Sequence, residues 1–187
     1  MSLPDKLNSM HYTYKDYITW DDDFRCEIID GQIYAMTAPN LFHQSIVGAL
    51  YAQLREFLKD KSCKVYLSPV DVRLNPDKDD DTVVQPDVIV VCDAKKTENK
   101  KHVLGAPDLV IEVLSTSTAH KDVLTKYHKY LEAAVKEYWI VNPETKTVNV
   151  FVLNNNVYNA YVYGESSDIP VTVLNGCYVN MTETFAQ

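Results

Sequence analysis

The chain has 187 residues, of which 46% are hydrophobic and 24% charged, and its formal net charge at pH 7 is −8. This length and balance are typical of a single globular domain, expected over residues 1–187, and exclude a disordered or fibrous protein. The acidic charge argues against tight, indiscriminate nucleic-acid binding, because such affinity comes mainly from Lys and Arg that neutralise phosphates. A catalytic site acting on nucleic acid stays open, since it needs only local positive potential.

The lack of an expected targeting segment and the spacing of the cysteines predict a cytoplasmic protein. The N-terminus lacks a basic stretch followed by an apolar one, and no apolar run approaches the roughly 20 residues that cross a bilayer. We therefore expect no membrane association. The cysteines are widely spaced, without the pattern of a zinc knuckle or a redox dithiol. Four residues are expected to be reduced and mostly buried: Cys26, Cys63, Cys92 and Cys177.

The first part of the chain predicts helices and strands in alternation. Asp30-Gly31 supplies the positive φ angles of a tight hairpin turn, and Asn40 is a suitable cap for a helix with apolar residues at helical spacing. The acidic run 77–81 is interpreted as a solvated loop. The expected elements are a short helix over 12–20, strands over 26–29 and 32–36, a long helix over 40–59, and strands over 64–67 and 70–74.

The second part begins with two apolar runs, Val83–Cys92 and Leu109–Leu114, which have the composition of strands covered on both faces. Ser115–Thr118 provides a turn and a cap for a second long helix, whose apolar stripe extends from Ala119 to Ala134. Further strands are expected over 137–141, 148–153 and 157–163. This order predicts an α/β fold with a central mixed sheet flanked by two long helices, and extra hairpins at both ends.

Glu112 is the most informative residue, because it lies in the middle of an aliphatic strand. A carboxylate there has a large desolvation cost unless it is protonated, paired or bound to a metal. Asp87 stands after Pro86 at the entrance of another apolar strand. If the two strands are neighbours, both acids converge at one end of the sheet and, with a backbone carbonyl, form a hard-oxygen site for Mg²⁺. The alternatives are a structural ion pair for Glu112 and a strand-end cap for Asp87.

Metal-assisted cleavage of a phosphodiester also needs a group that orients the attacking water and offsets negative charge, a role that suits lysine. On the second long helix, Lys126 falls at the border of the apolar stripe, whereas Lys121 points nearly opposite to it. Lys126 is therefore the candidate. The alternative is that Lys126 only extends along the surface toward solvent.

Three further residues carry weaker signals. Glu27, on the first hairpin, completes a site or makes a salt bridge with Arg25 or Arg73. His43 shares an apolar helix face, where a lone histidine is more often a hydrogen-bonded core residue than a ligand. Asp108 follows a proline as Asp87 does, but a strand-start acid is more often structural.

Several ordered blocks resemble the bacterial Uma-two endonucleases, long classed as a domain of unknown function within the PD-(D/E)xK restriction-endonuclease-like superfamily. The blocks cover nearly the whole chain: 26–31, 43–44, 70–74, 84–87, 105–115 and 137–141. The resemblance implies a restriction-endonuclease-like core in which Asp87 and Glu112 hold Mg²⁺, with Mn²⁺ as a substitute, and it also implies a homodimer. Leu114 stands where the superfamily pattern places lysine, and Lys126 from the next helix fits that role, with Glu27 as an extra acid.

Two hypotheses follow for the function. The first is a Mg²⁺-dependent DNA endonuclease that uses Asp87, Glu112, Lys126 and Glu27. The second is a non-catalytic, dimeric binding or regulatory module that keeps the carboxylates as a structural remnant, which the acidic charge and Leu114 favour. A carboxylate-pair glycosidase would need an aromatic sugar platform, and nothing in the sequence arranges the 13 tyrosines in that way.

Overall fold

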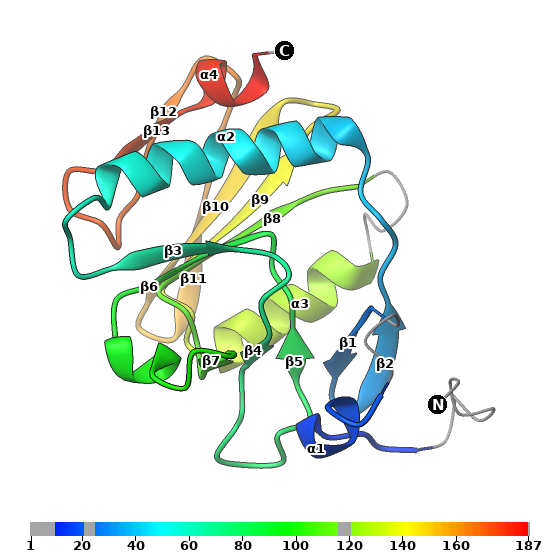
Figure 1. Cartoon of the computed structure of the whole chain (residues 1–187). Coiled ribbons are helices and arrows are strands. Elements are labelled where there is room, and N and C mark those ends of the chain that lie inside the picture. The colour runs from blue at the N-terminus through cyan, green and yellow to red at the C-terminus, as the bar shows by residue number, and fades with distance from the viewer. Residues whose placement is uncertain (1–9, 21–24, 116–120, 187) are drawn as a thin grey trace.

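The computed structural model describes residues 10–20, 25–115 and 121–186, and has the mixed α/β architecture that the sequence predicts (Figure 1). A six-stranded sheet is the centre of the fold, and all its neighbouring strands are antiparallel except β8 and β9, which are parallel. Its strands, in spatial order, are β11 (Val157–Tyr163), β10 (Thr147–Asn154), β9 (Glu137–Asn142), β8 (Leu109–Val113), β6 (Val88–Val91) and β3 (Lys64–Leu67).

A smaller five-stranded sheet lies beside the central one (Figure 1). Its strands, in spatial order, are β2 (Gln32–Ala35), β1 (Cys26–Ile29), β5 (Val83–Val84), β4 (Val72–Arg73) and β7 (Val103–Leu104). A two-stranded pair, β12 (Asp168–Pro170) with β13 (Tyr178–Asn180), follows β11 in the chain. The helices are α1 (Tyr14–Tyr17), α2 (Leu41–Phe57), the 3-10 helix η1 (Ala94–Thr97), α3 (Lys121–Glu132) and α4 (Met181–Phe185). No described helix is both long and apolar enough to cross a membrane.

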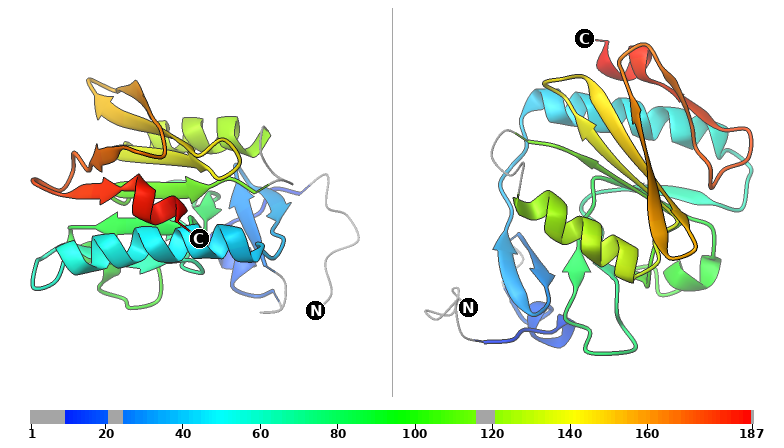
Figure 2. Two further views of the ribbon diagram at one scale, coloured as in Figure 1. Left: turned by 90° about the horizontal axis from the view of Figure 1, so that it is seen from above. Right: turned by 180° about the vertical axis from the view of Figure 1, so that it is seen from behind.

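The middle strands of the central sheet, β6, β8 and β9, are buried on both faces, with α2 and α3 on opposite sides of the sheet (Figure 2). Alternate residues along a strand point to opposite faces. In β6, Val88 and Val90 belong to the core cluster under α2, whereas Ile89 and Val91 belong to the cluster that contains Tyr130 of α3. The nearly continuous apolar strands expected from the sequence therefore reflect two hydrophobic cores separated by one sheet.

The expected strand Val83–Cys92 is wrong as a single element. It is divided into β5, in the smaller sheet, and β6, in the central sheet. The division falls at Gln85-Pro86-Asp87, where Pro86 has no N–H to donate and the Gln85 N–H bonds to a side chain, Glu27 Oε1, at 2.8 Å. The acid Asp87 therefore stands at the junction between the two sheets.

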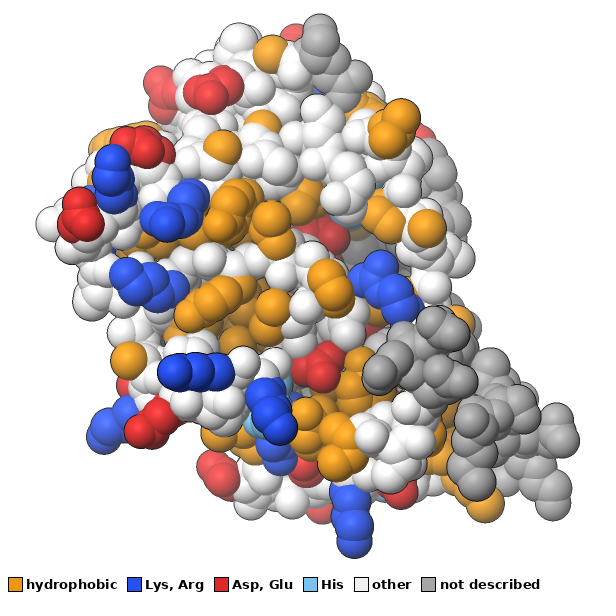
Figure 3. All heavy atoms as spheres, viewed as in Figure 1, with side chains coloured by type: hydrophobic (Ala, Val, Ile, Leu, Met, Phe, Trp, Pro, Cys, Tyr) orange, Lys and Arg blue, Asp and Glu red, His pale blue; other side chains and the backbone are white. Residues whose placement is uncertain are grey.

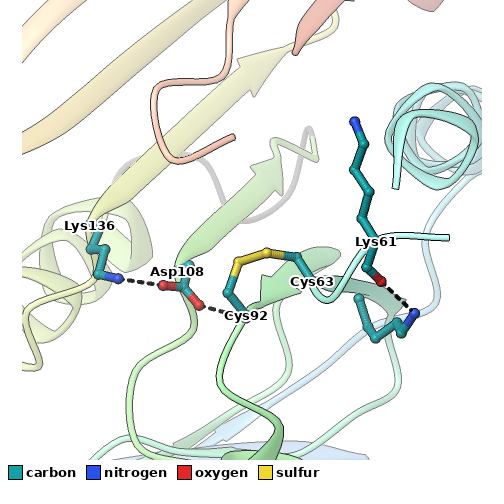
Figure 4. Close-up of a disulfide and its surroundings, with 6 residues drawn as sticks. Lys61, Cys63, Cys92, Asp108 and Lys136 are labelled. Carbon is teal, nitrogen blue, oxygen red and sulfur yellow. Dashed lines mark hydrogen bonds and ion pairs between the residues drawn. A yellow bond between two sulfur atoms is a disulfide. The ribbon is translucent and has the colours of Figure 1, made fainter. Parts of the chain in front are cut away.

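The cysteines also differ from expectation, because two of them form a disulfide, Cys63–Cys92 (Figure 4). The antiparallel pairing of Lys64 with Val91 continues outward and places the two cysteines opposite each other. Cys26 and Cys177 are buried free thiols. Asp108 accepts a hydrogen bond from the Cys92 N–H at 2.7 Å and pairs with Lys136 at 2.6 Å (Figure 4). The role of Asp108 is thus structural.

The disulfide closes a loop with a sequence separation of 29 residues. Loop closure of that size restricts the unfolded chain, so we expect reduction to lower the free energy of unfolding by about 3 kcal/mol. Urea unfolding with and without reductant measures this difference, and a thiol assay in denaturant should find two free thiols of the four cysteines without reductant. Four free thiols in freshly purified, unreduced protein would contradict the disulfide.

Glu137 begins β9 and is fully buried, where it joins the sheet to the C-terminal segment. Its carboxylate accepts hydrogen bonds from Trp139 Nε1 at 2.8 Å, Thr172 Oγ1 at 2.5 Å and the Val173 N–H at 3.0 Å. Burial raises the pKa of Glu137, and these hydrogen bonds only partly oppose the shift.

We expect this carboxyl group to make stability depend on pH. Because its pKa in the folded protein lies above the ordinary 4.5, the folded state binds more protons than the unfolded chain between the two values. The free energy of unfolding therefore falls as pH rises through that window. Glu137→Gln should lose this dependence and, because its amide nitrogen cannot accept, should be less stable near neutral pH by about 1–3 kcal/mol. Urea unfolding at several pH values tests both effects, and an unchanged pH profile in the variant would refute the first.

Candidate functional site

A cavity of about 620 Å³ opens between the two sheets and the start of α2, and it is lined by the four residues that the sequence singled out: Glu27, Asp87, Glu112 and Lys126. They come from β1, the β5–β6 junction, β8 and α3. Segments far apart in the chain thus supply one site.

Asp87 and Glu112 are brought together by strand register. β6 and β8 are antiparallel neighbours in which Val88 faces Ile111, so the next positions outward, Asp87 and Glu112, also face each other. The Val113 N–H donates to Asp87 Oδ2 at 2.8 Å and fixes that carboxylate on the end of β8. The two strands are therefore neighbours, and the acids converge as expected.

Lys126 points from α3 toward the sheet. Its Nζ donates to Glu112 Oε1 at 2.9 Å and to Glu27 Oε1 at 2.8 Å. The Lys126 side chain is only 13% exposed, and those of Glu112 and Glu27 are 13% and 7% exposed. Lys126 is thus held by two carboxylates and does not extend along the surface.

Glu27 connects the smaller sheet to the site. Besides Lys126, its Oε1 accepts the Gln85 N–H at 2.8 Å, the backbone group freed where β5 ends. The predicted alternative was a salt bridge with Arg25 or Arg73, and its Arg73 form is wrong because Arg73 pairs with Asp80 at 2.6 Å. The early hairpin therefore contributes an acid to a site whose other residues lie far along the chain.

The pKa values of Glu112 and Lys126 are both raised, for different reasons. Burial raises the pKa of Glu112 to about 7, with the nearby Asp87 and Glu27 acting in the same direction, while Lys126 and the Tyr130 hydroxyl oppose the shift. Tyr130 donates to Glu112 Oε1 at 2.7 Å from the buried face of α3. For Lys126, burial disfavours the ammonium, but the charges of Glu112 and Glu27 outweigh it and raise its pKa. Lys126 is therefore a cation at physiological pH.

His43 is more closely connected to the site than its sequence context indicated. It is buried on α2, and its Nε2 lies 3.0 Å from the Val113 carbonyl oxygen and 3.3 Å from Asp87 Oδ2. Its position on an apolar helix face favoured a core role, and only its place at the helix start, near the sheet end, could have signalled otherwise. Tyr130 was predicted only as part of the apolar stripe. The turn and cap expected over 116–118 lie outside the described residues.

Residues 14–182 match the model of the Uma2 family, described as "putative restriction endonuclease". The chain belongs to the Uma2 family. A solved structure similar to this Uma2 chain is that of a "putative nuclease belonging to DUF820" from Anabaena variabilis ATCC 29413, with 18% identity and a TM-score of 0.76 over 93% of this chain and 97% of the other. That likeness shows a shared fold. No curated protein matches the sequence. The family resemblance drawn from the sequence blocks is confirmed.

The pairing of Lys126 predicts a specific stability pattern for this Uma2 protein. Lys126→Met leaves two largely buried carboxylates without their cation, so we expect the free energy of unfolding to fall by about 3 kcal/mol. Adding Glu112→Gln should recover part of the loss, because one uncompensated charge disappears. Urea unfolding of the single and double variants measures the coupling.

Lys129→Met is the matched control, on the same helix. Lys129 pairs with Asp30 and Glu132, whose side chains are 60% and 64% exposed. Solvent screens such pairs, so its loss should cost less than about 1 kcal/mol. Equal losses for the two lysine variants would contradict a special role for the buried pairings.

Proposed function

We propose that this Uma2 protein is a Mg²⁺-dependent DNA endonuclease that hydrolyses phosphodiester bonds. Asp87 and Glu112 hold the cation, Lys126 orients the attacking water and offsets charge, and Glu27 supports Lys126 or the water. The observation that carries the proposal is that three carboxylates and one ammonium line a single cavity, in a chain from a family described as putative restriction endonucleases.

The oxygen atoms available in the cavity fit a hard divalent cation. The contacts of Asp87 and Glu112 use one oxygen of each carboxylate, Oδ2 and Oε1. The hydrogen bonds and ion pairs among the described residues leave out the other oxygens, Asp87 Oδ1 and Glu112 Oε2, and the two side chains are 18% and 13% exposed. The Val113 carbonyl lies at the same strand end. Oxygen ligands of this kind are those that Mg²⁺ and Mn²⁺ bind.

The charge balance of the cavity also favours a cation. Three acids, Glu27, Asp87 and Glu112, line the cavity together with one ammonium, that of Lys126, which pairs with Glu27 and Glu112. Burial and like charges already raise the pKa of Glu112. A divalent cation would relieve this repulsion. Among the described residues, no group of three acidic, histidine or cysteine side chains lies close enough to hold a metal ion. Mg²⁺ typically binds through one or two carboxylates and keeps several waters, so the proposed site uses Asp87 and Glu112.

The protein groups have separate roles in the proposed reaction. The bound cation would supply Lewis-acid activation of the phosphodiester and its water. Lys126, kept protonated by its two carboxylate partners, donates hydrogen bonds and positive charge where negative charge develops. Glu112 and Glu27 fix the position of Lys126, and Tyr130 in turn orients Glu112. A lysine supplied by α3 thereby takes the place of the one absent at Leu114.

DNA is the substrate expected for this set of residues, and the surface charge favours contact with DNA close to the cavity only. On the face drawn in Figure 3, basic side chains stand apart from one another among acidic and apolar ones. The net charge of −8 is consistent with this distribution. Binding would then depend on the cation and on groups close to the cavity, such as Arg25 and Lys126, and less on a long phosphate track.

The second candidate is a dimeric binding or regulatory module without catalysis. The acidic net charge favours it, as does the edge strand β11, which exposes Val157, Tyr161 and Val162. An uncharged edge strand of this kind is a surface on which a second copy can pair. In this alternative the carboxylate–lysine cluster serves stability alone.

Cleavage assays with plasmid DNA separate the two candidates. We expect the wild type to nick or linearise DNA with Mg²⁺ or Mn²⁺, and Asp87→Asn and Glu112→Gln to lose cleavage because each replaces a charged cation ligand with a neutral amide. Lys126→Ala should lower the rate by about 10²-fold or more. Lys129→Ala, on the same helix with exposed partners, should keep the wild-type rate.

Calorimetry with Mn²⁺ reports on the cation site independently of the DNA substrate. Wild type should bind, and the Asp87 and Glu112 variants should not, with folding of each variant checked by circular dichroism. The non-catalytic module would be favoured if the wild type neither binds Mn²⁺ nor cleaves DNA and if the acid variants change only the stability of the protein.

A further inference from the structure

We propose that His43 is a positioning residue that holds the Asp87 carboxylate and the Val113 carbonyl in the arrangement that the divalent cation requires. This inference rests on the proposed function. His43 Nε2 is the shared neighbour of the two oxygens, at 3.3 Å from Asp87 Oδ2 and 3.0 Å from Val113 O. Its side chain is 7% exposed. One buried ring nitrogen thus contacts both the sheet junction and the end of β8.

The chemistry of these neighbours decides which ring nitrogen carries the proton. A carbonyl oxygen and a carboxylate oxygen both accept hydrogen bonds and donate none. Nε2 therefore bears the hydrogen and donates it to them. The other nitrogen, Nδ1, is buried and has no hydrogen-bond partner among the described residues. Because a nitrogen that bears hydrogen cannot also coordinate a cation, the ring nitrogen that faces the site is not a ligand, and His43 acts on the site through Asp87 and Val113.

The surroundings of His43 make it a rigid support. It lies in the first turn of α2, where its own N–H donates to the capping side chain of Asn40 at 2.8 Å. α2 packs over the central sheet through Ile46, Leu50 and Leu54, all fully buried. Because α2 is held in place by this packing, the hydrogen bonds donated by His43 fix the positions of two candidate cation ligands, Asp87 and Val113. Groups that orient metal ligands in this way typically change metal affinity by 10–100-fold when they are removed.

Calorimetric titration of Mn²⁺ into His43→Leu, His43→Gln and wild type tests the role. Leucine fills similar space and donates nothing, so we expect at least about tenfold weaker Mn²⁺ binding. Glutamine reaches about as far as imidazole Nε2 and can donate from its amide, so its affinity should stay within about threefold of wild type. His128→Gln, at an exposed position of α3, is the matched control and should bind as the wild type does.

Urea unfolding without metal distinguishes positioning from a purely structural contribution. A structural histidine would lower stability while the folded protein kept its Mn²⁺ affinity, and restoring the donor with glutamine would not matter for binding. The positioning role is overturned if His43→Leu binds Mn²⁺ as tightly as wild type, or if His43→Gln binds as weakly as His43→Leu. It is also overturned if pulsed electron paramagnetic resonance detects directly coordinated imidazole nitrogen on the bound Mn²⁺.

The same titration separates this inference from the proposed cation site. If wild type binds Mn²⁺ and the His43 variants match it, only the role of His43 fails. If wild type and all variants leave Mn²⁺ unbound, the cation site itself is refuted, and the positioning role with it.

Discussion

The bridge from Lys126 to Glu27 and Glu112 is the interaction on which the arrangement of the molecule depends. Its three members come from α3, the smaller sheet and the central sheet, so one ammonium joins the three parts that enclose the cavity. Two carboxylates facing each other in a largely buried place would otherwise repel. Burial of such charges has a cost that packing must offset, which explains why large apolar cores flank the site on both faces of the sheet.

The junction between the two sheets is where structure and proposed chemistry meet. Ending β5 at Gln85 releases a backbone N–H that holds Glu27, and starting β6 at Val88 places Asp87 beside β8. Pro86 lies between them and has no N–H for either ladder. A short interruption of one apolar run thus positions two acids from opposite sheets at the same cavity. Both acids are also held in place by backbone hydrogen bonds, Glu27 by the Gln85 N–H and Asp87 by the Val113 N–H.

The whole chain and the candidate site are both acidic. The chain has a net charge of −8, and the cavity is lined by three carboxylates and by the ammonium of Lys126, which two of them already pair. A cation held by the remaining carboxylate oxygens would make the cavity attractive to a phosphate while the rest of the surface repels one. An acidic surface that repels the DNA backbone is compatible with an enzyme that contacts few phosphates. The affinity for DNA must then come from the cavity itself.

The sequence by itself determined most elements, because their signals are local. Three of these signals depend only on neighbours along the chain: the Asp30-Gly31 turn, the cap at Asn40 and the strand 109–113, which has apolar residues on both faces. Glu112 stood out for the same reason, as a charge in an aliphatic strand. Short elements such as β7 and η1 were missed, since two to four residues carry little periodic signal.

Tertiary structure alone decided the pairings. Strand register chose which acids meet, the sheet junction divided the run 83–92, and antiparallel pairing of β3 with β6 joined Cys63 to Cys92. The contact of His43 with Val113 joins residues 70 positions apart, and no pattern in the sequence around either residue indicates it. A sequence records the cost of burying a charge at one position, but the partner that offsets this cost is set by packing between distant segments, which the three-dimensional fold alone specifies.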